Sequence, residues 1–221
     1  MPRESFDHKL RLLQDELLVM GSMVGKAIAR AIEALKDRNL EMARHVIAND
    51  LKINEKRYKI EDNCLELLAT QQPMAGDLRV IVAVLSIITD LERIADHAEG
   101  IAKIVLMLGD EPPLKPLIDV PRMATKIDDM LRRSLTAFIE SDTEAAKKIS
   151  AEDDEIDNLY DQIYRELLLF MLQDPRTISR ATYLLWVGHN LERMADRVTN
   201  ICERVVFMVS GRIEEMNVSK Y

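Results

Sequence analysis

The sequence repeats itself over most of its length, and this repeat constrains the fold more than any other feature. Residues 90–102 read DLERIADHAEGIA and residues 190–202 read NLERMADRVTNIC, so Leu, Glu, Arg, Ala, Asp and Ile recur at an offset of 100. Two copies of one segment must fold as two copies of one unit. The apolar residues within it are three and four apart, which is the spacing of an amphipathic helix.

A second stretch repeats at an offset of 103. The apolar residues between Ala43 and Leu67 recur between Ala146 and Phe170 with the same alternation of three and four. The offset falls to 100 further on because TQQPMAGDLR is matched by the shorter LQDPRTISR, and Pro73 and Pro175 mark the same turn.

Each half therefore reads as three helices. The first runs over about 6–36 with a counterpart at 121–139, the second carries the stripe just described, and the third runs over about 76–108 with a counterpart at 177–209. Asp142 is a predicted N-cap. The segment GDEPPLKPLIDVPR lies between the halves, and its four prolines disfavour helix. We predict an all-α fold of six helices in two tandem three-helix bundles, with units at 1–109 and 123–221 and a linker at 110–122.

Charge excludes some partners. Thirty basic and thirty-eight acidic residues give a net charge of −8, which does not attract nucleic acid or an anionic lipid surface. Metal ions or cationic partners suit the chain better. No stretch approaches the roughly 18 apolar residues of a membrane span, and the first ten residues have no apolar core of a signal peptide. We therefore expect a cytoplasmic protein.

Acidic residues stand where helix stability does not favour them. Like charges four apart on a helix cost a few tenths of a kcal/mol, yet both copies of the third helix keep a Glu and an Asp at this spacing. In the second helix, Asp50 and Asp153 occupy positions of the apolar stripe, where an ionised carboxylate is costly unless it is paired or bound to metal. If these helices are adjacent, their acids face one another and repel without a cation.

This pattern predicts a metal site in each half. The candidate ligands are Asp50, Asn54, Glu92 and Asp96 in the first half, and Asp153, Asp157, Glu192, Asp196 and Asn200 in the second. Oxygen ligands alone select hard ions such as Mg²⁺, Mn²⁺, Ca²⁺ or iron. The alternative is that the acids are solvated or pair with Arg93, Arg193 and Arg197.

These features together resemble the PhoU family of bacterial phosphate-signalling regulators. The resemblance rests on the tandem three-helix repeat, the two Glu-Arg-x-x-Asp motifs, the acids of the second helix and the MGSMV of the first. It implies a cytoplasmic adaptor, associated with the membrane only through its partners, that links the ATPase subunit of a phosphate ABC transporter to a sensor histidine kinase and restrains the phosphate-starvation response.

The resemblance also implies metal clusters, with iron or zinc among the ions, and a homodimer. The longer family motif, Glu-x-x-x-Asp-x-x-x-Asn, is complete in the second half through Asn200. The first half has Gly100 at that position and Asn54 where an acid is common.

A carboxylate-bridged di-iron oxidoreductase is the alternative function. Such sites use Glu-x-x-His on two helices of a bundle. No Glu lies three residues before any of the four histidines of this chain. We therefore expect an adaptor rather than an enzyme, with no catalytic residues.

Overall fold

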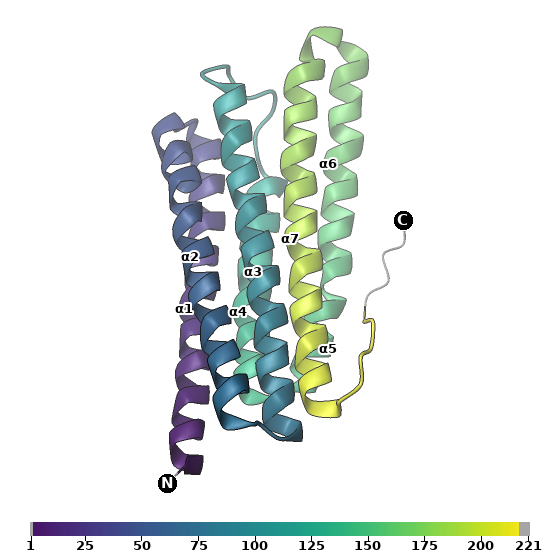
Figure 1. Ribbon diagram of the computed structural model, residues 1–221. Coiled ribbons are helices and arrows are strands. Elements are labelled where there is room, and N and C mark those ends of the chain that lie inside the picture. Colours follow the sequence, from purple (N-terminus) through teal and green to yellow (C-terminus); the bar gives the residue numbers. More distant parts are fainter. Residues whose placement is uncertain (1, 217–221) are drawn as a thin grey trace.

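The computed structural model describes residues 2–216 and is built from helices that lie side by side along one direction (Figure 1). The elements are α1 (Pro2–Asp37), α2 (Leu40–Gln71), α3 (Ala75–Leu108), α4 (Asp119–Glu140), α5 (Thr143–Ala151), α6 (Asp153–Gln173), the 3₁₀ turn η1 (Pro175–Thr177) and α7 (Ile178–Ser210). There is no strand among these residues, so the predicted all-α fold is confirmed. Within the same range, no helix combines the length and apolar character that crossing a lipid bilayer requires.

Helices α2 and α5 begin at equivalent positions of the two repeats. Asn39 caps α2, because its side chain accepts a hydrogen bond from the Met42 N–H at 2.9 Å. Asp142 caps α5 in the same way, accepting from the Ala145 N–H at 2.9 Å, as predicted. Both caps satisfy a backbone donor that the first turn of a helix leaves unpaired.

Two local features differ from the prediction. The second helix of the second half is interrupted at Glu152. There the Glu152 N–H donates to Ile149 O and the Glu155 N–H donates to Glu152 O. Each of these hydrogen bonds spans three residues, as in a 3₁₀ helix. The helix predicted to begin at about 121 begins two residues earlier, so Pro121, the last proline of the inter-repeat segment, lies inside α4. It sits in the first turn, where a helix needs no N–H donor, so the fixed backbone angle of proline is tolerated.

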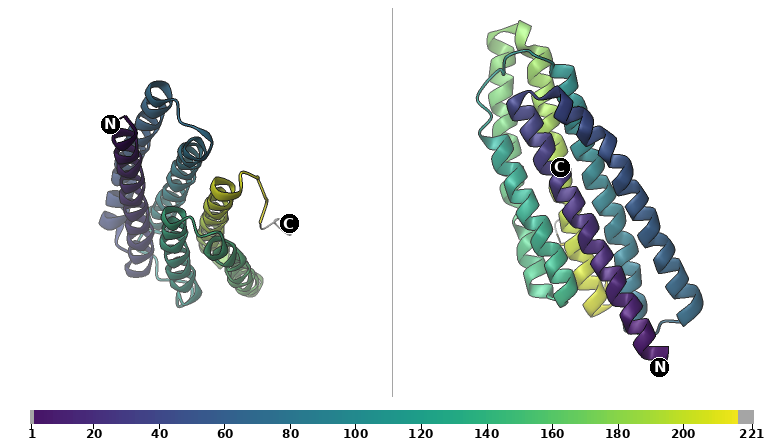
Figure 2. Two further views of the ribbon diagram at one scale, coloured as in Figure 1. Left: turned by 90° about the horizontal axis from the view of Figure 1, so that it is seen from below. Right: turned by 90° about the vertical axis from the view of Figure 1, so that its left-hand side faces the viewer.

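Equivalent helices of the two repeats meet one another. The most extensive contact in the protein joins α3 to α7, and α1 packs on α4 (Figures 1 and 2). The arrangement therefore resembles a twofold interface within one chain. Buried positions on α1 recur on α4 at the offset of 103, from Met20 and Met123 to Leu35 and Phe138, and a single apolar core runs through both repeats.

Candidate functional site

The second repeat brings acids of α6 and α7 together. Asp157 on α6 and Asp196 on α7 both act electrostatically on Glu192, so these three carboxylates are neighbours across the two helices, as the sequence predicts. Asp153 lies one turn before Asp157, at the first position of α6, and only 4% of its surface is exposed. A carboxylate so deeply buried needs compensating interactions.

Glu192 has a strongly perturbed carboxyl group. Burial, together with the negative charges of Asp196 and Asp157, raises its pKa from 4.5 to about 7. Arg193 of α7 acts in the other direction on the pKa of Glu192. Arg193 Nη1 donates to Asp196 Oδ2 at 2.6 Å, and His189 Nδ1 lies 3.3 Å from Glu192 Oε2. The pKa of Glu192 thus stays raised in spite of Arg193, and such a concentration of negative charge favours binding of a positive ion.

The first repeat forms a similar face from α2 and α3. The pKa of Asp50 is raised by burial and then by the charges of Asp96, Glu99 and Glu92, so acids of both helices gather there. Asn54 Nδ2 donates to Asp50 Oδ2 at 2.9 Å and partly offsets this rise. The uncharged Asn54 thus acts as an internal donor to the first face, whereas its repeat counterpart Asp157 adds a charge to the second.

Several oxygen atoms of the first face lack a donor in the described part of the chain. Asp50 Oδ1, Asn54 Oδ1 and Glu92 Oε2 are buried and accept no hydrogen bond. Arg93 Nε lies 3.5 Å from Glu92 Oε2, which is too long for a strong hydrogen bond. Buried acceptors without donors are costly. A hard cation would satisfy all three, because carboxylate and amide oxygens are its preferred ligands.

The two faces are nevertheless open arrangements. Within residues 2–216, no three His, Cys, Asp or Glu side chains converge closely enough to hold a metal ion. The chemistry of the donors fits a hard cation, and the unsatisfied oxygens of the first face support that fit. Metal ligation by these residues stays a prediction.

Asn200 does not lie on the acidic face, in contrast to the predicted ligand set. Its side chain lies where α7 packs on α3, and its Nδ2 donates to Oδ1 of the buried Asp90 at 3.2 Å. Arg197 Nη1 lies 3.5 Å from the same oxygen. Each step of four residues turns a side chain by about 40° around a helix. Asn200 is two such steps beyond Glu192 and therefore faces a different neighbour.

The equivalent place on the other side of the pseudo-twofold interface has a different contact. The repeat counterparts of Asp90 and Asn200 are Asn190 and Gly100. His97 Nδ1 lies 2.9 Å from Asn190 Oδ1, and a Cβ atom at Gly100 would approach this oxygen to 3.0 Å. Burial lowers the pKa of His97, which favours the neutral ring. His97 is thus engaged between the repeats, and Gly100 provides space for Asn190.

Glu99 contributes to the first face and is absent from the predicted ligands. Its counterpart in the second repeat is Thr199, so a search for repeated acids passes over it. Its spacing of three residues from Asp96 was the available signal, because residues three apart on a helix share a face. Lys103 Nζ pairs with Glu99 Oε2 at 2.5 Å and holds this carboxylate in place.

The fold and the facing acids define a class of helical protein built from two tandem copies of one acidic three-helix unit. The PhoU domain model matches residues 17–105 and 120–205, one match in each repeat. The chain therefore belongs to the PhoU family.

Similar proteins cover nearly the whole chain. A phosphate-specific transport system accessory protein PhoU homolog of Aquifex aeolicus is 40% identical over 93% of this chain and 93% of its own length. A homolog of the same description from Clostridium acetobutylicum is 37% identical over 98% of this chain and 100% of its own. The crystal structure of PhoU from Pseudomonas aeruginosa superposes with a TM-score of 0.88 at 33% identity, and covers 94% of this chain and 100% of that one.

Proposed function

We propose that this protein is a cytoplasmic accessory regulator of a phosphate-specific transport system. It binds the ATPase subunit of the phosphate ABC transporter and a sensor histidine kinase, and restrains the phosphate-starvation response when phosphate is plentiful. It is an adaptor without catalytic residues and works as a homodimer. Regulation of this kind requires only that the adaptor bind one state of its partner more tightly than another.

One observation carries this proposal. Relatives that are 40% and 37% identical over almost their full length bear the description of phosphate-specific transport accessory proteins. The arrangement of the acids also favours an adaptor over the di-iron alternative, because the two acidic faces lie on separate repeats and not around one bundle centre.

We further propose that each acidic face binds metal ions, of which iron, Mg²⁺, Mn²⁺ and Zn²⁺ are the candidates. The ligands would be Asp153, Asp157, Glu192 and Asp196 on the second face and Asp50, Asn54, Glu92 and Asp96 on the first. A bound cation neutralises the crowded carboxylates, so it would hold the two helices of each face in register and shape the surface that a partner contacts.

The experiment removes the two acids of α7. In a strain that depends on this protein, Glu192→Ala with Asp196→Ala is expected to derepress phosphate-starvation genes in phosphate-rich medium. The same purified variant, untagged, is expected to lose the metal that copurifies with the wild type, measured by mass spectrometry, while its helical circular dichroism is unchanged.

The matched control is Arg193→Ala, which alters the same face without removing a carboxylate and should retain metal. Normal repression by the double variant at normal protein level would contradict a role for the acidic face. Normal repression in a strain that lacks the whole gene would contradict the adaptor proposal itself.

A further inference from the structure

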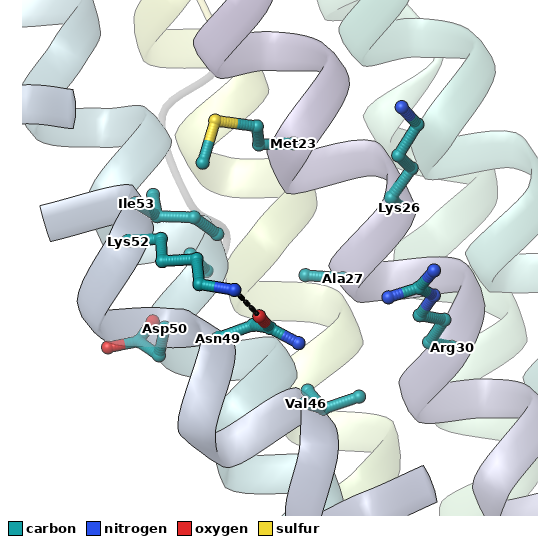
Figure 3. Close-up of a pocket in the computed structure, with 10 residues that line it drawn as sticks. Met23, Lys26, Ala27, Arg30, Val46, Asn49, Asp50, Lys52 and Ile53 are labelled. Carbon is teal, nitrogen blue, oxygen red and sulfur yellow. Dashed lines mark hydrogen bonds between the residues drawn. The ribbon is translucent and has the colours of Figure 1, made fainter.

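A second site lies beside the first acidic face on α2 and shares Asp50 with it. Residues of α1 and α2 surround a cavity of about 150 Å³ whose floor is apolar and whose rim is basic. Figure 3 shows Lys26 and Arg30 on α1 and Asn49 and Lys52 on α2. Lys52 Nζ donates to Asn49 Oδ1 at 2.8 Å. Three cationic side chains thus line one small pocket in a protein whose net charge is −8.

No carboxylate of the described residues forms an ion pair with Lys26, Arg30 or Lys52. Asp50 also lines the cavity, but its carboxylate accepts from Asn54 and faces the acids of α3. In Figure 3 it lies further from α1 than Asn49 does. The basic side chains therefore give this exposed pocket an excess of positive charge, which would attract an anion.

In the second repeat, carboxylates of the chain itself occupy the equivalent place. The offset of 103 that relates α1 and α2 to the second repeat aligns Lys26 with Asp129, Arg30 with Arg133, Asn49 with Glu152, and Lys52 with Glu155. Glu152 accepts both Nη1 and Nη2 of Arg133, at 2.8 and 2.6 Å. Lys126 Nζ lies 2.7 Å from Glu152 and 3.1 Å from Glu155.

The two repeats therefore differ by a charge inversion at one structural position. The second repeat supplies the acids Asp129, Glu152 and Glu155 around its arginine. The first keeps the arginine as Arg30 and replaces those acids with two lysines and one amide. Acids of the chain balance the arginine in the second repeat, whereas the exposed Arg30, Lys26 and Lys52 of the first repeat are accessible to an anion from outside the chain. An anion carrying two charges would replace the carboxylates of Glu152 and Glu155.

We propose that the pocket between α1 and α2 binds a phosphate group as a dianion. Arg30 and Lys52 contact its oxygens from opposite walls, and Lys26 adds a third positive charge. Asn49 Nδ2 donates one N–H to His45 O at 2.8 Å, and its second N–H donates to the anion. Hydrogen bonds between charged partners are the strong ones, and a guanidinium suits the oxygens of phosphate. The proposal of an anion site rests on the charge inversion and the pocket lining, whereas the choice of phosphate rests on the proposed function.

The position of the pocket suggests what the anion would do. Asp50 belongs both to the pocket lining and to the first acidic face. An anion in the pocket and a cation on the acidic face would therefore lie near each other and attract, so each would favour binding of the other. The second repeat cannot respond in this way, because its arginine is already neutralised by Glu152.

The test is a calorimetric titration of inorganic phosphate into the purified full-length chain. Wild type is expected to bind. Lys52→Glu installs the residue of the second repeat and should weaken binding by about tenfold or more, which corresponds to about 1.4 kcal/mol. Arg30→Gln is a second variant, expected to act in the same direction. Lys148→Glu on the exposed surface of α5 is the matched control, with the same charge change, and should alter affinity by less than about twofold.

Further arms identify the source of the phosphate group. ATP that binds more tightly than inorganic phosphate, with the same loss in Lys52→Glu, assigns the pocket to a nucleotide phosphate and supports the proposal. The proposal is overturned if succinate binds as tightly as phosphate. It is also overturned if neither inorganic phosphate nor ATP binds, or if Lys148→Glu weakens binding as much as Lys52→Glu does. The titration uses the purified chain alone, so an absence of phosphate binding would not contradict the proposed regulation in cells. Likewise, normal repression in a strain without the gene would not contradict a measured binding of phosphate.

Discussion

The two repeats share their apolar positions and differ in their charges. Leu91 and Leu191 are both fully buried at equivalent places, and so are most partners along the stripes. In contrast, the pocket beside Arg30 is basic, and the equivalent place around Arg133 is filled with acids. The difference indicates that packing fixes the core of both copies, while surface charge is free to diverge. In the second repeat, acids of the chain neutralise the basic side chains at this place, whereas in the first repeat the basic side chains remain accessible to a ligand.

The largest expected effect tests the similarity of the cores. Leu91→Ala and Leu191→Ala each remove a side chain with 0% exposure. Each should lower the free energy of unfolding by about 3 kcal/mol, because a buried Leu→Ala change loses transfer energy and leaves a cavity. Urea denaturation followed by circular dichroism measures both values. A difference of more than about 1.5 kcal/mol between the two would show that the repeats are not equivalent in packing.

An intermediate effect tests the charge inversion. Arg133→Ala removes two charge-assisted hydrogen bonds to Glu152 and leaves that carboxylate without its main partner. We expect a loss of about 1.5 kcal/mol in the free energy of unfolding, reduced from the value of a buried pair because both side chains are partly exposed. Arg30→Ala, the equivalent change in the first repeat, should cost less than about 0.5 kcal/mol in phosphate-free buffer. Equal losses would remove the distinction between the two pockets.

The smallest effect concerns pH and the second acidic face. The pKa of Glu192 is about 7 in the folded protein and 4.5 for an ordinary glutamate. The folded state therefore holds this proton more tightly than the unfolded state. Stability that depends on Glu192 is fully present below about pH 4.5, decreases as pH rises toward 7, and stays reduced above that value.

Glu192→Gln removes this penalty. In buffer with a chelator, thermal melting should show the variant more stable than wild type by about 0.5 kcal/mol at pH 8, after allowance for solvent screening, and nearly equal to it at pH 4.5. A variant that is more stable by the same amount at both pH values would show that shape, and not charge, is responsible.

Helix positions and the facing acids could be predicted because they follow from local rules. The stripes of α2 and α3, the cap at Asp142 and the juxtaposition of Asp157 with Glu192 all depend on helical spacing and one short connection. The interruption at Glu152 could not be predicted in this way. It coincides with the contact between the Glu152 carboxylate and Arg133 on another helix, and the local sequence gives no sign of that contact.

The sequence by itself determined that this chain is two copies of one acidic three-helix unit, because periodicity and internal repetition are properties of the chain alone. Tertiary structure decided how the copies meet. It placed Asn200 against Asp90 between α3 and α7 and away from Glu192, and it brought Arg30 and Lys52 to one cavity. Contacts between distant helices depend on the angle around each axis and on which faces pack, so only the folded chain reveals them.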